Sequence, residues 1–192
     1  MTDNSKALLY KVIINLTEIS VSNFDKLFEI AKHREFAKGE IILKQGQICK
    51  TIMFVEKGYL RTYIDKDGKE INTDFTFEGS FTTNLKSLRS ASLADASIQA
   101  GEIATIYEFD KDKLLDLYKV SAEIESFGRK LLEQLLIVQE EHCNLFKIYA
   151  ATERYNYILK SNPTLLQRIS LSQLASYLGL TRETLTRIRG KK

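Results

Sequence analysis

The chain has 192 residues, of which 44% are apolar and 28% are charged. This composition is typical of a globular protein that buries a core, and it excludes a disordered chain. The opening MTDNSKALLYKVIINL has neither an apolar run long enough for a membrane span nor the series of a signal peptide, so we expect a cytoplasmic protein. The two cysteines, Cys49 and Cys143, exclude a disulfide framework and a four-cysteine iron–sulfur cluster.

The positive charge is concentrated near the C-terminus. The whole chain carries +3, but residues 147–192 hold nine Lys or Arg and two Asp or Glu, a net of +7 that leaves −4 on residues 1–146. A basic terminal quarter indicates a separate module that faces a polyanion. A solvated basic tail is the alternative, but Leu, Ile and Tyr recur here at helical spacing, which favours a folded module.

The N-terminal region is predicted to be helical and the region after it to be a small β-barrel. Apolar positions repeat three and four apart over about residues 6–32, which predicts one or two helices, with Ser22 or Asn23 as an N-cap. From Arg34 to Phe109, short β-rich runs alternate with glycine turns, the pattern of an antiparallel barrel or jelly roll. Asp67-Gly68 is a strong hairpin signal, because both residues tolerate positive φ.

A long helix is predicted from about Ala122 to Ala150, after a shorter helix that Asp110 caps. One apolar stripe of the long helix alternates spacings of four and three, as a two-stranded coiled coil requires. We therefore expect a homodimer; the alternative is a core helix of a monomer. The residues predicted to form the dimer interface are Ile124, Leu131, Leu135, Val138, His142, Leu145 and Tyr149, with Gly128 on the same stripe.

Two further interpretations concern this helix. A second stripe is expected to pack against the chain's own barrel, and it consists of Leu132, Leu136, Cys143 and Phe146. His142 is interpreted as a polar residue that sets the register of the coiled coil rather than as a metal ligand, because His33 is the only other histidine in the sequence.

The chain closes with one short helix that ends before Pro163 and then a pair of helices. Ser170 and Gln173 have the spacing of a capping box, which starts the first helix of the pair. Gly179 stands where a tight turn needs positive φ, and Thr181 is placed to cap the second helix. This order of cap, buried apolar residues, glycine turn and polar helix is typical of a helix-turn-helix.

The outward face of the last helix predicts contact with DNA bases. Leu185 and Ile188 point inward, three residues apart, and leave the polar residues outward. Arg can donate two hydrogen bonds to guanine, and Glu can accept one from cytosine. Glu183 is informative, since a helix built for phosphate alone would not place a carboxylate beside a polyanion, although a helix N-terminus also favours it. The predicted DNA-binding residues are Arg182, Glu183, Thr186, Arg187, Arg189 and Lys191.

At this point the sequence resembles the CRP/FNR family of bacterial transcription regulators. The segment LASYLGLTRETLTRIR is similar to that family's DNA-reading element, and FAKGEIILKQGQICKTIMFVEKGYLRTYIDKDGKE is similar to the first half of its cyclic-nucleotide-binding barrel. The resemblance implies a homodimer that pairs through its long helix and binds a two-fold-symmetric site. It further implies that Arg182, Glu183 and Arg187 read a G·C-containing half-site.

The sequence departs from the family where the nucleotide phosphate is expected to bind. Nucleotide-binding members carry Gly-Glu and then Arg-Ser/Thr-Ala, whereas here Ser80 follows Gly79 and Asp95 stands where the arginine is expected. A carboxylate would repel the phosphate, so we do not expect cyclic AMP to bind in the usual way. The candidate ligand pocket, for an unknown small molecule in place of a cofactor, consists of Gly79, Ser80, Arg89, Ala94, Asp95 and Ala96.

These observations predict an α+β protein with three parts. Residues 1–120 are expected to form a cyclic-nucleotide-binding-like sensor, 121–150 a dimerisation helix and 151–192 a helix-turn-helix domain. The expected function is sequence-specific transcription regulation, and the alternative is a small-ligand sensor or protein-interaction module with vestigial DNA binding. We expect no enzyme, because residues 34–109 contain no histidine for a metal-dependent jelly-roll enzyme. The expected partners are double-stranded DNA, a second copy and RNA polymerase, without a membrane or metal.

Overall fold

The computed structural model describes residues 3–190, and its first elements are two helices, α1 (Asp3–Leu16) and α2 (Val21–Glu29). The N-cap of α2 is Ser20, whose hydroxyl accepts from the Asn23 amide, so the prediction of Ser22 or Asn23 was wrong. The cap is reinforced from a distant part of the chain. The Glu123 carboxylate accepts from the Ser20 backbone at 2.7 Å and from its hydroxyl at 2.8 Å, which fixes α2 to the long helix.

Eight antiparallel strands follow and form two four-stranded sheets, ordered β1-β8-β3-β6 and β2-β7-β4-β5. The strands are β1 (Ala31–Phe36), β2 (Ile41–Leu43), β3 (Thr51–Lys57), β4 (Leu60–Lys66), β5 (Lys69–Thr76), β6 (Phe81–Thr82), β7 (Ser97–Ala100) and β8 (Ala104–Asp110), with α3 (Leu85–Ser90) between β6 and β7. The predicted antiparallel jelly roll of an α+β protein is confirmed. Its interior is apolar and includes the fully buried Val55, Ala104 and Ile106.

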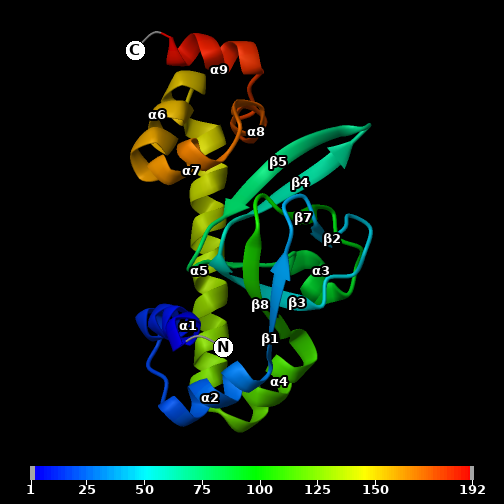
Figure 1. Cartoon of the computed structure of the whole chain (residues 1–192), viewed down its shortest axis with the longest axis vertical. Helices are drawn as coiled ribbons and strands as arrows, with labels where there is room; N and C mark the ends of the chain where they lie inside the picture. The colour runs from blue at the N-terminus through cyan, green and yellow to red at the C-terminus, as the bar shows by residue number, and fades with distance from the viewer. Residues whose placement is uncertain (1–2, 191–192) are drawn as a thin grey trace.

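The predicted hairpin at Asp67-Gly68 is confirmed as the turn between β4 and β5. Asp67 has φ 55° and Gly68 has φ 77°, the pair of positive values that a type I′ turn requires. The Gly68 amide donates to the Asp65 carboxylate at 2.9 Å, which closes the turn. In Figure 1 this hairpin projects from the barrel toward the C-terminal helices.

A long helix, α5 (Ala122–Ile148), runs along the barrel after the shorter α4 (Lys111–Val120). Both predicted starts have a clear cause, because Asp110 accepts from the Asp112 and Lys113 amides and Ser121 accepts from Ile124. The first half of α5 packs on α1, α2 and α4, as Figure 1 shows. Its second half extends to the C-terminal helices and joins them to the barrel.

Four helices form the C-terminal module, which we define as residues 151–190 and which caps the far end of α5 in Figure 1. They are α6 (Ala151–Ser161), α7 (Pro163–Arg168), α8 (Leu171–Tyr177) and α9 (Arg182–Arg189). The sequence analysis did not anticipate α7. Pro163 stands at its first position, where a missing N–H is tolerated, and the Asn162 side chain accepts from Leu165. The proline therefore ends one helix and begins the next.

Candidate nucleic-acid interface

The terminal pair α8 and α9 is held together by local contacts that the sequence encodes. Ser170 and Gln173 form the predicted capping box, with the Ser170 hydroxyl accepting from Gln173 at 3.2 Å and the Gln173 side chain accepting in return at 3.1 Å. Leu174 and Ala175 of α8 are buried against Leu185 of α9 in one apolar cluster. A small residue at 175 allows the two helices to approach closely.

The turn between the helices has the predicted conformation. Gly179 has φ +67°, and the Leu180 amide donates to the Ala175 carbonyl at 2.8 Å. Arg154 of α6 donates to the Leu178 carbonyl at 2.8 Å, so α6 supports the C-terminus of α8. Thr181 caps α9 by accepting from the Thr184 amide at 3.2 Å. Contacts before the turn, from Arg154, and after it, from Thr181, therefore fix the direction of α9.

One face of α9 is buried and the other is open to solvent. Leu185 and Ile188 are 0% and 8% exposed, whereas Glu183 and Arg187 on the opposite side are exposed, as is Arg189 at the end of the helix. The outer face is slightly hollowed, with an open depression of about 440 Å³ that is lined by Arg182, Glu183, Thr186 and Arg187. The structure thus brings together four predicted DNA-binding residues, while Lys191 lies outside the described residues.

Glu183 remains a carboxylate within this basic face. Its own backbone N–H and the Thr181 hydroxyl hold the pKa of the Glu183 carboxyl below its usual range. The group lies in the first turn of α9, where the N-terminal end of the helix also favours negative charge. At neutral pH the outer face therefore presents hydrogen-bond donors from Arg182 and Arg187 and one charged acceptor between them.

The predicted dimer interface needs correction, because part of it lies inside the protomer. Ile124 and Leu131 are 0% and 4% exposed and pack in the cluster that contains residues of α1, α2 and the barrel. Leu145 is 2% exposed and packs with the C-terminal module. Leu135 is partly buried on the first cluster. These four side chains stabilise the single chain, whereas Val138 and Tyr149 from the same stripe are exposed.

The second stripe of α5 is exposed, whereas we expected it to be buried against the barrel. Leu132, Leu136 and Phe146 are 40%, 54% and 38% exposed, and Cys143 is also exposed, so these residues do not pack on the barrel as predicted. Helical periodicity identified both stripes, but it could not tell which one faces the chain's own core. The face that remains open to a partner is therefore the one that holds Leu132 and Leu136.

His142 lies at a junction of three parts of the molecule. Its ring stacks on Tyr177 of α8 with centroids 5.2 Å apart, and Tyr177 in turn meets Phe75 of β5 edge-on at 5.4 Å. Burial lowers the pKa of His142, and the neighbouring Asp74 carboxylate opposes this shift. Desolvation raises the pKa of Asp74. The His142 Nε2 atom is buried and makes no hydrogen bond within the described residues.

The candidate ligand residues line neither the depression on the outer face of α9 nor the cleft between the β4–β5 hairpin and α8. Ser80, Arg89 and Asp95 are exposed, and the Asp95 carboxylate accepts from the side-chain amide of Asn84 at 2.8 Å. Gly79, with φ 76°, bonds through its amide to the Val55 carbonyl at the barrel wall. Ala94 and Ala96 are buried.

The barrel interior beneath this region is filled by side chains. Ala94 joins the buried cluster together with Leu88 of α3 and Ile98 of β7. The buried Ser87 hydroxyl bonds to the backbone on both sides: it accepts from the Cys49 amide at 2.8 Å and donates to the Ser92 carbonyl at 2.6 Å. The Cys49 amide and the Ser92 carbonyl are therefore satisfied within the chain.

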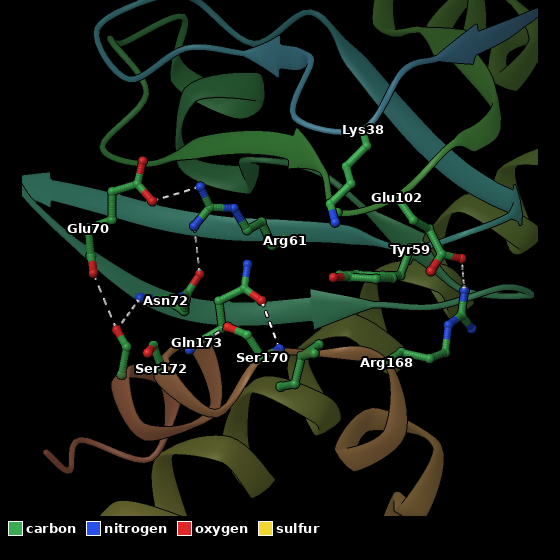
Figure 2. A pocket seen from close by; sticks show the side chains of 13 residues that line it. Lys38, Tyr59, Arg61, Glu70, Asn72, Glu102, Arg168, Ser170, Ser172 and Gln173 are labelled. Carbon is green, nitrogen blue, oxygen red and sulfur yellow. Dashed lines mark hydrogen bonds and ion pairs between the residues drawn. The ribbon is translucent and has the colours of Figure 1, made fainter. Parts of the chain in front are cut away.

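A contact that the sequence analysis missed joins the C-terminal module to the barrel. Arg168, at the end of α7, donates to both oxygens of Glu78 at 2.7 and 2.8 Å and also pairs with Glu102. Figure 2 shows the Arg168 side chain reaching Glu102 beside the Tyr59 ring. The guanidinium lies over the stacked rings of Tyr59 and Phe77, at 5.4 and 5.0 Å from their centroids. The two carboxylates raise the pKa of Arg168, which stays charged.

A second contact joins α8 to the β4–β5 hairpin. The Ser176 hydroxyl of α8 accepts from the Asn72 amide at 2.9 Å and donates to the Glu70 carbonyl at 3.3 Å. Arg61, 8% exposed, binds Asn72 at 3.2 Å and Glu70 at 2.7 Å and so stiffens this strand pair, as Figure 2 shows. The two contacts border a cleft of about 700 Å³ between the hairpin and the C-terminal module.

Comparison with known proteins supports the fold of the barrel. Residues 33–121 match the profile of the cyclic nucleotide-binding domain family. No curated protein sequence matched the chain. The barrel therefore has the cyclic-nucleotide-binding fold, which in this chain lies between the N-terminal helices and α5.

Solved structures extend the likeness to most of the chain. FixK2 from Bradyrhizobium japonicum superposes with a TM-score of 0.72 at 20% identity, covering 84% of each chain. The catabolite activator protein of Thermus thermophilus gives 0.56 at 21% identity, over 90% of this chain and 83% of that one. A protein described as a Crp/Fnr-family transcriptional regulator from Eubacterium rectale gives 0.67 at 20% identity, over 90% and 83%. Regulatory proteins thus share this fold.

Neither a membrane-spanning helix nor a metal-binding cluster is present in the part of the chain that the structure describes. Within residues 3–190, no helix is both long and apolar enough to cross a membrane. Nor does this part of the chain bring three or more His, Cys, Asp or Glu side chains together in a way that would hold a metal ion.

Proposed function

We propose that this protein is a homodimeric transcription regulator that reads DNA with α9. The observation that carries the proposal is the two-sided character of α9, in which Leu185 and Ile188 are buried while Arg182, Glu183 and Arg187 are exposed together. An α-helix with such a face fits the major groove, where Arg and Glu side chains can discriminate bases. Proteins of the same fold described as transcriptional regulators make this the best-supported use of the face.

The proposed dimer pairs through the exposed stripe of α5. Leu132, Leu136, Gln139, Cys143 and Phe146 follow spacings of four and three and are all exposed in the single chain. This is the heptad pattern of a two-stranded coiled coil, and burying it removes apolar side chains from water. Pairing along this stripe brings two α9 helices to one DNA duplex, where half-sites are about 34 Å apart.

Selection of bound duplexes from a random-sequence library tests the proposal. The expected result is a sequence with two inverted half-sites whose centres are about 10 base pairs apart, each with G·C pairs opposite Arg182, Glu183 and Arg187. Enrichment of no sequence would overturn the base-reading role. If the protein regulates transcription in this way, RNA polymerase is a further predicted partner.

We further propose that cyclic AMP does not control this regulator through the usual pocket. Asp95 holds the Asn84 amide where a phosphate-binding arginine was expected, and apolar side chains fill the barrel beneath it. The expected result is an unchanged melting temperature when millimolar cyclic AMP is added. A marked increase would show that the barrel accepts the nucleotide, because a ligand that binds the folded state alone stabilises it.

A further inference from the structure

The orientation of the C-terminal module is set by an apolar cluster that it shares with the barrel and α5, and by a small number of polar contacts. Covalently, the module is joined to α5 by Tyr149 and Ala150, two exposed residues with extended backbone. Such a short non-helical connection leaves rotation about its backbone torsions open, so contacts with the barrel and with α5 must select one orientation. Arg168 makes the strongest of these contacts, since it is bidentate to Glu78 and also paired with Glu102.

The barrel backbone holds the Glu78 carboxylate directly and anchors the residue before Glu102. Glu78 accepts from the Gly58 amide at 2.8 Å, and the next residue, Gly79, donates to the Val55 carbonyl at 2.9 Å. Glu102 follows Gly101, whose amide donates to the Tyr59 carbonyl at 2.9 Å. Arg168 therefore meets in Glu78 a partner that the barrel already holds, and the stacked rings of Tyr59 and Phe77 support its guanidinium.

We propose that Arg168, Glu78 and Glu102 form an interdomain clamp that holds α9 in position for binding two DNA half-sites at once. The inference rests on the proposed DNA binding and concerns its regulation. None of the clamp residues belongs to the outer face of α9, so the clamp leaves that face free. Holding both modules in place before binding removes an ordering cost that DNA would otherwise have to offset. The clamp also links α9 to the loop of residues 77–80.

Charge and geometry make opposite predictions for one variant, which allows a sharp test. Glu78→Gln with Glu102→Gln removes two negative charges and so strengthens attraction to DNA if charge alone matters. The same variant takes from Arg168 both of its ionised partners, so it weakens binding if the clamp matters. The matched control is Glu18→Gln with Glu29→Gln, which removes two exposed carboxylates away from the clamp.

The probes are the duplex selected by the wild-type chain and the same duplex with one half-site scrambled. The clamp variant is expected to bind the intact duplex about tenfold more weakly than the control, within the usual range of coupling between sites, and the scrambled duplex about equally. Binding of the intact duplex as tight as by the control, or tighter, would overturn the clamp.

A second measurement does not depend on DNA. Trypsin cleavage after Lys147, at the end of α5, should be several-fold faster in the clamp variant than in the control, because the module detaches more often. Equal rates would also overturn the clamp. If no duplex is selected at all, the proposed function fails, while the cleavage rates still decide whether the clamp exists.

Discussion

The backbone at Gly58 has φ +81°, and a Cβ atom there would lie 2.5 Å from the Ile103 carbonyl oxygen and 2.9 Å from the Ala104 Cα. Replacement by alanine therefore incurs both backbone strain and a clash with a buried strand. We expect Gly58→Ala to lower the free energy of unfolding by about 2–5 kcal/mol. Gly68→Ala is the control, because Gly68 has φ +77° but open space around it. Its expected loss is about 1 kcal/mol in the same urea titration. Equal losses would contradict the clash.

Glu183 offers a test of base reading that is separate from charge. Replacing it with alanine removes an acceptor from the outer face of α9, so discrimination at one base pair should fall by about 1–3 kcal/mol. Binding to unrelated duplexes should stay the same or become tighter, because a negative charge has left the interface. The comparison is Glu140→Ala, which changes the charge equally on the exposed surface of α5. Competition binding with single-base variants measures the effect; a uniform loss over all sequences would refute it.

Local signals in the sequence explain most of what could be predicted. Ser170, Gly179 and Thr181 act on neighbours within a few residues, so their roles follow from spacing alone, and the structure places them as expected. The Arg168 contact could not be found in this way, because Glu78 lies 90 positions away in the sequence. A basic residue near the end of a short helix reads as an ordinary surface charge until the fold brings the two carboxylates to it.

The long helix shows a different limit. A period of 3.6 identifies stripes of apolar residues but not the surface that each stripe meets. Both stripes of α5 were recognised, but the stripe that meets the protomer's own core was assigned wrongly, because Ile124 and Leu131 cover that core while Leu132 and Leu136 stay exposed. Which stripe is buried depends on where α1 and α2 pack against α5. That contact consists of a buried apolar cluster and is reinforced by a hydrogen bond between Ser20 and Glu123, which are 103 positions apart.

The proposed role of the exposed stripe in dimer formation can be tested at two neighbouring positions with similar exposure. Leu136 and Ile137 are 54% and 50% exposed, yet they lie about 100° apart around the helix. Leu136→Asp places a charge in the proposed seam and should convert the dimer into a monomer at micromolar concentration. Ile137→Asp should leave the dimer intact, since this residue points away from the stripe. Light scattering on the purified proteins measures the mass, and equal effects of the two changes would exclude this seam.

Asp74, His142 and Tyr177 come from the barrel, the long helix and the C-terminal module, so their titration reports on how the three parts pack together. Burial lowers the pKa of His142 and leaves Nε2 without a hydrogen-bond partner within residues 3–190. As pH falls through about 6.5, the unfolded chain gains a proton that folded His142 resists, so stability falls until the lowered pKa is reached. Asp74, whose pKa is raised by desolvation, acts in the opposite sense, because as pH falls the folded chain gains a proton at Asp74 before the unfolded chain does.

His142→Phe separates these two contributions, because phenylalanine keeps the stacking on Tyr177 and removes the titrating group. We expect the variant to be more stable than the wild type by about 1 kcal/mol at pH 7.5, since a buried polar atom without a partner has been removed. The difference in the free energy of unfolding should be larger at pH 5.5, because there the wild type alone is destabilised by a histidine that is protonated more readily in the unfolded chain. Urea unfolding at the two pH values measures it, and Tyr157→Phe, a half-exposed aromatic position, is the control. A difference that stays constant with pH would mean that His142 is not the titrating group at this junction.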